Sequence, residues 1–145
     1  MEKISLTKQV NIASSPSDVF ELVTDPKALV EYYPIQSAQS DRCVEGSFIL
    51  KGQAGEDDFV DYGVIEVYEP GKCFRYNYWS TNHGTEDIPS NRMTIEYKFV
   101  EIEKDRTTHL EVIHDNLLTE ERRIMMDQFW DYLLSQLKSY AEKTQ

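Results

Sequence analysis

One histidine stands where a side chain could do chemistry inside a folded core. His114 shares its alternation with Leu110 and Val112 in a segment of strand character, so its ring is predicted to lie on the buried face. An imidazole there can act in acid–base chemistry or orient a ligand, and it can equally be a structural residue near the sheet edge. His83 lies in a polar loop that could form a lid, and His109 lies on the opposite face of its strand; solvent exposure is the simpler expectation for both.

Tyrosines recur on the same faces as apolar residues in the neighbouring strand segments. Tyr76 and Tyr78 share the alternation of Phe74, and Tyr97 and Tyr62 follow apolar alternations of their own. Aromatic faces with a few hydroxyl groups suit a planar, mostly apolar ligand with one or two polar groups. The same residues would also make a tyrosine-rich core in which each hydroxyl reaches backbone, water or the rim. The predicted ligand-binding residues are Tyr62, Tyr76, Tyr78, Tyr97, His114, Met126 and Trp130.

No local motif indicates a catalytic, metal or cofactor site. The acidic run at 56–58 with Asp61, and the pair at 86–87, lack the ligand spacing and turn glycine of a calcium loop, so solvated charge is expected there. There is no His and Cys cluster for a transition metal, and no nucleophile elbow, phosphate-binding loop or dinucleotide fingerprint. An enzyme hypothesis would depend on His114 and the tyrosines alone. We therefore predict no catalytic residues, no metal and no cofactor, and favour a non-catalytic protein.

The composition argues against several classes of partner. The 145 residues carry 15 Lys and Arg against 26 Asp and Glu, a formal net charge of −11. Such a surface repels nucleic acids and anionic lipids, so neither is expected as a partner. The hydrophobic content of 40% supports a single globular domain over residues 1–145. The chain starts without the apolar stretch of a signal peptide, and Cys43 and Cys73 are expected to be free thiols, so a cytoplasmic location without membrane insertion is predicted.

Helix caps and apolar repeats predict an α+β order of elements. A strand over residues 4–12 is followed by a helix that Ser15 caps, and Pro26 opens a second short helix. Residues 36–115 read as strands, with a bulge expected at Gly63 and a type II turn at 70–71. Apolar residues at steps of three and four predict a long amphipathic helix after Thr119. A curved sheet around that helix would leave a cavity where the two diverge.

Segments spread in order along the chain resemble one superfamily. They are residues 10–20, 24–26, 45–48, 63–67, 74–79, 108–110 and 114–117, with Leu29 and the spacing of Trp130, Leu134, Leu137 and Tyr140. They are similar to the SRPBCC, START-like superfamily of the birch pollen allergen, and within it to the family named for activators of the ninety-kilodalton heat-shock chaperone's ATPase. The resemblance implies a helix-grip fold, in which a curved antiparallel sheet of about seven strands wraps a long C-terminal helix. It also implies two short helices between strands 1 and 2, and a pocket that Phe129, which stands where relatives often have glycine, could partly fill.

That superfamily hosts several activities, so the resemblance leaves three functions open. The favoured one is binding of a small hydrophobic or aromatic ligand, such as a lipid, polyketide or flavonoid-like compound, between the sheet and the C-terminal helix. The second is a co-chaperone-like module that binds a chaperone or another protein, with an acidic surface suited to a basic partner. The third is a cyclase- or hydrolase-like enzyme that uses His114.

Overall fold

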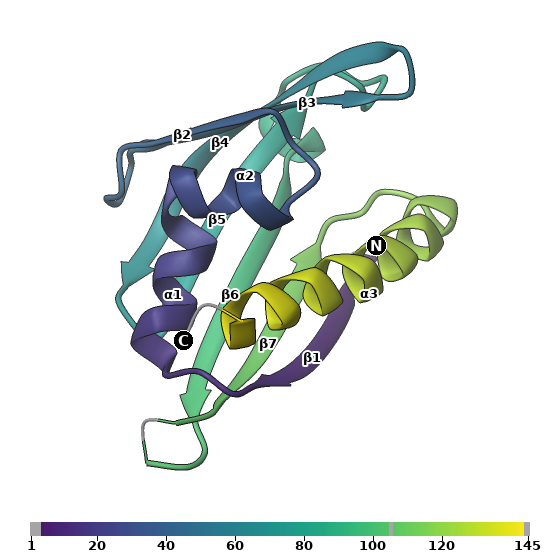
Figure 1. The fold of residues 1–145 in the computed structure, drawn as a ribbon. Coiled ribbons are helices and arrows are strands. Elements are labelled where there is room, and N and C mark those ends of the chain that lie inside the picture. Colours follow the sequence, from purple (N-terminus) through teal and green to yellow (C-terminus); the bar gives the residue numbers. More distant parts are fainter. Residues whose placement is uncertain (1–3, 105, 144–145) are drawn as a thin grey trace.

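The computed structural model describes residues 4–104 and 106–143. Its elements follow the predicted α+β order, with two short helices between the first two strands (Figure 1). The strands are β1 (Leu6–Ile12), β2 (Ser37–Ser40), β3 (Ser47–Ala54), β4 (Asp57–Glu69), β5 (Cys73–Ser80), β6 (Met93–Glu101) and β7 (Thr108–Asp115). The helices are α1 (Pro16–Thr24), α2 (Pro26–Tyr32) and α3 (Glu120–Lys143), with a short 3₁₀ helix at Pro89–Asn91.

The strands form one antiparallel sheet in the order β1-β7-β6-β5-β4-β3-β2. The sheet curves, and all three α-helices lie on its concave side (Figure 1). α3 lies closest to the edge strand β1, whereas α2 lies next to β2 at the other edge. The long helix is therefore gripped by the sheet, and the predicted helix-grip fold is confirmed.

Local capping signals set where the helices begin. The Ser15 hydroxyl accepts a hydrogen bond from the N–H of Asp18 at 3.2 Å, and Pro16 occupies the first turn, where its missing N–H costs nothing. The Thr119 hydroxyl accepts from the N–H of Arg122 at 3.1 Å at the start of α3. Both caps agree with the sequence prediction, because each depends only on residues within one turn.

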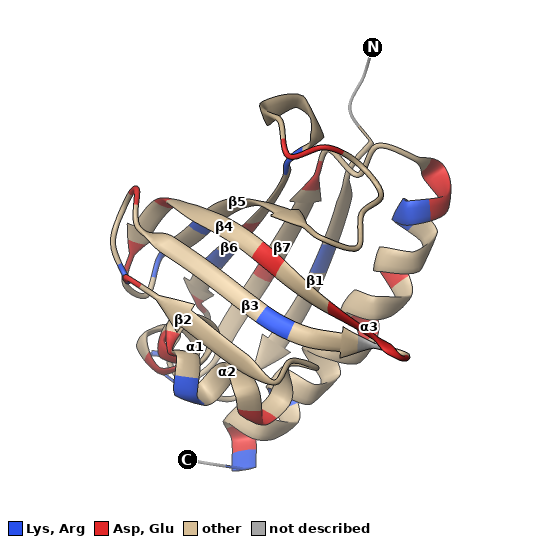
Figure 2. Ribbon diagram, turned by 90° about the horizontal axis from the view of Figure 1, so that it is seen from above, with Lys and Arg blue, Asp and Glu red and all other residues tan. Residues whose placement is uncertain are grey.

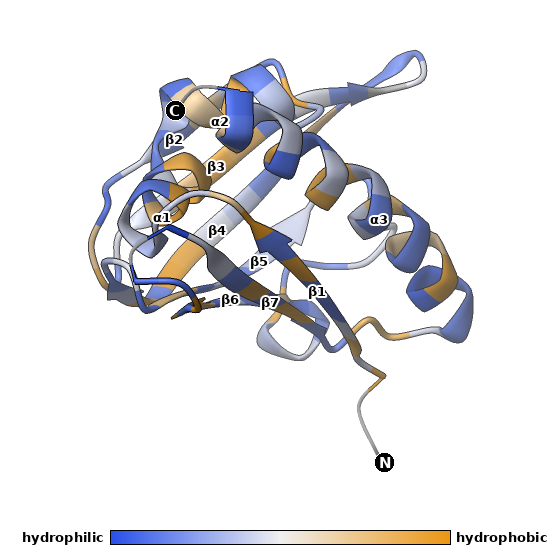
Figure 3. Cartoon of the chain, turned by 60° about the horizontal axis from the view of Figure 1, so that its bottom comes forward, coloured by the Kyte–Doolittle hydropathy of each residue, from blue (hydrophilic) through white to orange (hydrophobic). Residues whose placement is uncertain are grey.

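α3 is held on the sheet by an apolar stripe and by charges on its flank. Apolar and polar stretches alternate around the helix and along the strands (Figure 3). Lys8 of β1 reaches two carboxylates one turn apart on α3, that of Asp127 at 2.8 Å and that of Asp131 at 2.6 Å. The helix is thus fixed against the edge strand. The buried members of its stripe are Trp130, Leu133, Leu134, Leu137 and Ala141.

β4 departs from the sequence prediction. The expected bulge at Gly63 is wrong, because Gly63 pairs regularly with Tyr78 and the register shifts between Ile65 and Val67 instead. A Cβ atom on Gly63 would come within 2.5 Å of the Phe48 carbonyl oxygen. The glycine is therefore needed for the close approach of β3, not for a bulge.

The turn between β4 and β5 follows the prediction. Gly71 has a φ of +74°, a conformation that side chains with a Cβ atom rarely adopt. The N–H of Lys72 donates to the carbonyl of Glu69 at 2.9 Å, closing the four-residue turn. This hairpin aligns β5, which carries Tyr78, with β4.

The surface mixes both charge signs. Lys and Arg lie on several separate elements among Asp and Glu (Figure 2). Cys43 is exposed and Cys73 partly buried, and both are free thiols. Across residues 4–104 and 106–143, no helix is both long and apolar enough to span a bilayer.

Candidate functional site

A pocket of about 320 Å³ lies between the inner face of the sheet and the N-terminal half of α3. Strands β3 to β7 supply one wall and α3 the other, and the segments after α2 and after β5 close the sides. Most of the lining is apolar and aromatic, with a few carboxyl, hydroxyl and amide groups. Its rings belong to Tyr33, Phe59, Tyr78, His83, His114, Phe129 and Trp130.

Three side chains from three elements form a hydrogen-bonded chain at the base of this pocket. The Nε1–H of Trp130 donates to Nδ1 of His114 at 3.0 Å, and Nε2 of His114 lies 2.9 Å from the hydroxyl of Tyr78. An indole can only donate, so Nδ1 must be the accepting nitrogen and the imidazole proton sits on Nε2. Nε2–H therefore donates to the Tyr78 oxygen, and the direction of the whole chain is set by Trp130.

His114 is neutral in this arrangement. Burial lowers the pKa of its imidazole to about 3, and the charges of His83 and Arg122 add to the effect. Both ring nitrogens already have partners, so His114 has no free position with which to take a proton from a bound molecule. Its role here is to orient the Tyr78 hydroxyl.

The Tyr78 hydroxyl is the end of the chain that faces open space. Its oxygen accepts from His114, and its own proton points to the thioether sulfur of Met93 at 3.5 Å, a weak acceptor. Burial, with the nearby Asp61 carboxylate, keeps the pKa of Tyr78 well above its ordinary value. Tyr78 is therefore a hydrogen-bond donor oriented by the protein and free to bind a better acceptor.

Asp61 places a carboxyl group on the pocket wall. It lies on β4 directly opposite Ser80 of β5 and faces inward. Burial raises its pKa to about 6, and hydrogen bonding from Ser80 opposes that rise. The expectation that this residue belongs to a solvated acidic run is wrong, because the pairing of β4 with β5 turns it toward α3.

A second, smaller pocket of about 160 Å³ adjoins the first and shares part of its wall with it. The guanidinium of Arg122, from the first turn of α3, lines this space and donates through Nη2 to the carbonyl of His83 at 3.1 Å. The His83 ring lies 5.7 Å from that of Tyr78, and burial lowers the pKa of His83 to about 4. The expectation of an exposed histidine is wrong: the loop after β5 folds over the pocket and half-buries His83.

Two larger hollows lie elsewhere on the surface. One, of about 690 Å³, is lined by the residues around Ser15 and Arg106; the other, of about 660 Å³, by those around Arg75 and Asn116. Their linings are mainly polar and charged and contain no aromatic ring. The aromatic pocket beside α3 is the better candidate for a ligand site.

The comparisons with known proteins place this fold in a family. The family model described as Activator of Hsp90 ATPase homolog 1-like protein matches residues 13–142. The chain belongs to this family. A search of curated proteins gave no match.

Solved structures share this fold over most of the chain. The solution structure of ChR145 from Cytophaga hutchinsonii has a TM-score of 0.83 at 22% identity, covering 99% of this chain and 98% of that chain. A START superfamily protein from Mycobacterium smegmatis has a TM-score of 0.78 at 14% identity, covering 99% and 100%. Protein CV1439 from Chromobacterium violaceum has a TM-score of 0.78 at 16% identity, covering 95% and 97%. At these identities the likeness is one of fold alone.

The structure brings part of the predicted residue set to the pocket of this family member. Tyr78, His114, Met126 and Trp130 all line it. Tyr76 and Tyr97 instead belong to the core beneath, with 2% and 3% of their surfaces exposed. A tyrosine-rich core and an aromatic pocket, which were alternatives at the level of sequence, therefore both exist as successive layers.

Tyr62 lies on the wrong face of the sheet for the pocket. It is 44% exposed and stacks on Trp79 at the outer surface, with ring centroids 6.5 Å apart. The prediction followed the apolar alternation of Tyr62 with its neighbours on β4. Gly63 pairs with Tyr78, whose side chain faces inward, and paired residues lie on the same face of a sheet. The inward-facing residues of β4 are therefore those that alternate with Gly63, including Asp61 and Ile65.

The pocket lining also contains residues that were not predicted as ligand contacts, among them Tyr33, Phe59, Asp61 and Phe129. Phe129 packs edge-on against Tyr33 at 5.9 Å and Trp130 at 5.8 Å, so it narrows the pocket, as expected, without filling it. Asp61 could have been found from its alternation with Ile65. Phe59 shares this alternation, whereas Tyr33 carries no such signal, because it reaches the pocket only through the path of the chain after α2.

Among the described residues no group of three or more His, Cys, Asp or Glu side chains is arranged to hold a metal ion. The polar groups that line the two pockets include a neutral histidine, an oriented phenol, a carboxyl with a raised pKa and an arginine. Such a set can orient a ligand by hydrogen bonds and charge.

Proposed function

We propose that the chain binds a small, mostly apolar or aromatic molecule, of the lipid, polyketide or flavonoid-like kind, in the pocket beside α3 and does so without catalysis. The observation that carries the proposal is the aromatic pocket of about 320 Å³, whose lining includes Tyr78 with its oriented hydroxyl. The family and the START-like fold are consistent with a ligand-binding module.

The size and lining of the pocket support a small ligand. Ligand pockets in proteins span roughly 300–1,000 Å³, are mostly apolar and contain a few placed polar groups. This pocket is at the small end of that range. Phe129 and Trp130 offer ring faces from α3, and Phe59 and Ile95 face them from the sheet. A planar body between these walls would gain both apolar burial and ring contacts.

The hydrogen-bond geometry supports binding over turnover. A general base must have a free position and a pKa near the working pH. His114, the residue on which an enzyme hypothesis rests, has neither, since its pKa is about 3 and both nitrogens are engaged. If the protein has an enzymatic activity and the His114→Gln variant retains it, a cyclase- or hydrolase-like mechanism that uses His114 is excluded.

The test is titration with N-phenyl-1-naphthylamine, an uncharged aromatic probe whose fluorescence increases in an apolar site. Met126→Trp places an indole in the pocket wall, whereas Ile124→Trp adds the same indole to a position two residues away that is 50% exposed. We expect the wild type and Ile124→Trp to bind alike and Met126→Trp to bind at least 10-fold more weakly. No binding to the wild type, or equal binding by all three, would contradict the proposal.

Native mass spectrometry of protein purified from its own host would identify the natural ligand. A bound compound should also raise the stability, by about 2.7 kcal/mol when its free concentration is 100 times its Kd. Thermal unfolding with and without the compound measures this directly.

The second candidate is the co-chaperone-like module. It is favoured by the family description and by the net charge of −11, which would attract a basic partner surface. Salt-sensitive binding to a heat-shock chaperone together with stimulation of its ATPase would support it, and no effect on the ATPase would exclude it. The predicted cytoplasmic location stays a prediction, with which the two free cysteines agree.

A further inference from the structure

Arg122, which lines the smaller pocket, has a buried side-chain nitrogen that binds nothing. Within the described part of the chain, Nη1 of Arg122 is the one buried side-chain nitrogen or oxygen that has no hydrogen-bond partner. Its neighbour Nη2 donates to the carbonyl of His83, which holds the guanidinium in place. Buried donors in native proteins nearly always have partners, and a charged donor without one is especially costly. An unpaired Nη1 on a side chain that lines an open space therefore points to a group that binds there.

The Tyr78 hydroxyl supplies a second donor to the same space. Its proton points to the sulfur of Met93, and both residues line the smaller pocket with Arg122. Because Trp130 fixes the tautomer of His114, the Tyr78 oxygen accepts from Nε2–H and the Tyr78 proton is left to donate elsewhere. Two donors, one of them charged, thus face one compartment.

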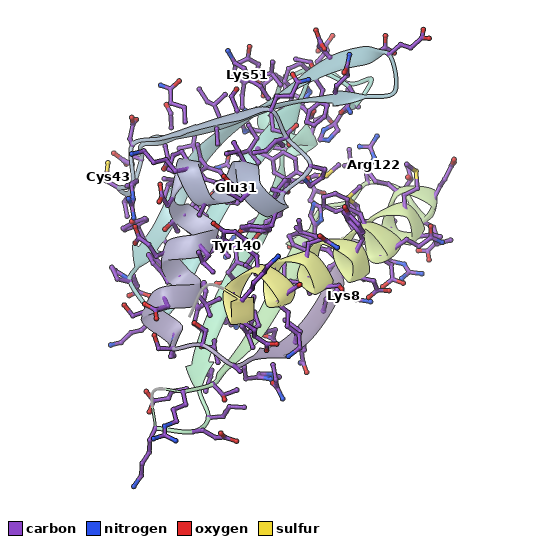
Figure 4. The ribbon with its side chains drawn as sticks, viewed as in Figure 1. Lys8, Glu31, Cys43, Lys51, Arg122 and Tyr140 are labelled. Carbon is purple, nitrogen blue, oxygen red and sulfur yellow. The ribbon has the colours of Figure 1, made fainter. Side chains whose placement is uncertain are left out.

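The charges of the two pockets separate them. The lining of the smaller pocket contains no carboxylate, whereas Asp61 lies on the wall of the larger one. A negative group would be repelled by ionised Asp61 in the larger pocket and attracted by Arg122 in the smaller. Figure 4 shows Arg122 above the N-terminal half of α3, on the side that faces the β3–β4 hairpin. The pockets share Tyr78, Asn82, His83 and Met126 as a common wall, so one ligand could extend across both.

We propose that the smaller pocket binds the carboxylate of an amphiphilic organic acid whose apolar part lies in the larger pocket. The carboxylate oxygens would accept from Nη1 of Arg122 and from the Tyr78 hydroxyl. A planar guanidinium and a carboxylate form short, charge-assisted hydrogen bonds of this kind. The inference rests on the proposed ligand-binding function and adds the chemical class of the ligand and its orientation.

The test is displacement of N-phenyl-1-naphthylamine by decanoate and by 1-decanol at pH 8, which share a tail and differ in the head group. We expect decanoate to bind the wild type at least 10-fold more tightly than decanol. Arg122→Gln should abolish that preference and leave decanol binding unchanged. Arg123→Gln is the matched control, because Arg123 is the next residue of α3 and pairs with Glu120 at the surface; it should retain the preference.

Each other outcome overturns the inference. Equal binding of the two competitors by the wild type, or a preference that survives Arg122→Gln, would overturn the carboxylate site and leave the apolar pocket in place. A loss of decanol binding in Arg122→Gln would mean that Arg122 acts by holding the loop at His83. Displacement by acetate as strong as that by decanoate would make a free small anion the ligand. If the probe itself fails to bind, the proposed function fails as well.

A measurement on the wild-type protein needs no variant. The guanidinium ¹⁵N signals of Arg122 should shift when decanoate is added and not when decanol is added. Unchanged signals at saturating decanoate would overturn the inference even if Arg122→Gln does not fold.

Discussion

Replacing Asp61 by asparagine is expected to stabilise the protein at neutral pH. Burial raises the pKa of this carboxyl from 3.8 to about 6. One pKa unit corresponds to ~1.36 kcal/mol, so ionised Asp61 would cost up to ~3 kcal/mol of folding free energy above pH 6. The side chain is only partly buried, and screening by solvent reduces this to about 1–2 kcal/mol. Asparagine keeps the shape of the side chain but has no charge to desolvate.

The stabilisation should diminish in acid. Because the folded-state pKa is raised, the folded chain binds more protons than the unfolded chain between pH 3.8 and about 6. The cost of ionised Asp61 is fully present above that window and is lost as the pH falls through it. We expect the gain from Asp61→Asn at pH 7.5 to fall to about a third at pH 4.5. The lowered pKa of His114 acts in the opposite direction, destabilising the fold below pH 6.5, but it affects variant and wild type equally.

Urea unfolding at pH 7.5 and at pH 4.5, followed by tryptophan fluorescence, measures the difference. Asp58→Asn is the control, because Asp58 is an exposed carboxylate on the same strand; its stability should match the wild type within about 0.5 kcal/mol. A less stable Asp61→Asn at pH 7.5, or a gain that is the same at both pH values, would refute the argument from desolvation. Together with a loss of ligand binding, a stabilised variant would show that the carboxyl group is kept for function.

Two further substitutions test the geometry of the site. Tyr78→Phe leaves Nε2–H of His114 buried and unpaired and should lower the free energy of unfolding by about 1–3 kcal/mol. The control is Tyr97→Phe, which should change that free energy by less than about 0.5 kcal/mol, because the Tyr97 hydroxyl has no hydrogen bond to any described residue. Equal losses in urea unfolding would contradict the hydrogen-bonded chain. Gly63→Ala places a methyl group within 2.5 Å of the Phe48 carbonyl oxygen and should lower the free energy of unfolding by about 1–3 kcal/mol. Unchanged thermal stability would show that β3 and β4 can separate there without penalty.

Prediction from sequence was most reliable where neighbouring residues decide the outcome. The caps at Ser15 and Thr119, the turn at Gly71 and the long stripe of α3 each depend on a few adjacent or helically spaced side chains. The same holds for β5, whose alternation placed Tyr78 on the inner face. These signals also placed the three members of the hydrogen-bonded chain on the inner surface, since His114 and Tyr78 follow clean alternations and Trp130 follows the helical spacing of α3.

The prediction failed where both faces of a strand carry apolar residues. Around residue 62, β4 has Val60, Tyr62 and Val64 on one face and Asp61 and Ile65 on the other. The number of apolar residues predicts that the first face is buried, whereas the pairing of β4 with β5 places the second face inward. The pairing prevails because a shift by one residue would place Gly63 away from the β3 backbone that needs it and bring Tyr62 into a core already filled by Tyr76.

By itself, the sequence determined the elements and their order, because caps, turns and alternation are local, and its resemblance to a known family implied the curved sheet around a terminal helix. Only the tertiary structure decided that Trp130, His114 and Tyr78 would form one directed chain, that Asp61 would face the pocket, and that Arg122 would be left with a buried nitrogen unpaired. These features join residues from different elements. Their hydrogen bonds and pKa shifts arise from burial and distance, which no spacing along the chain specifies.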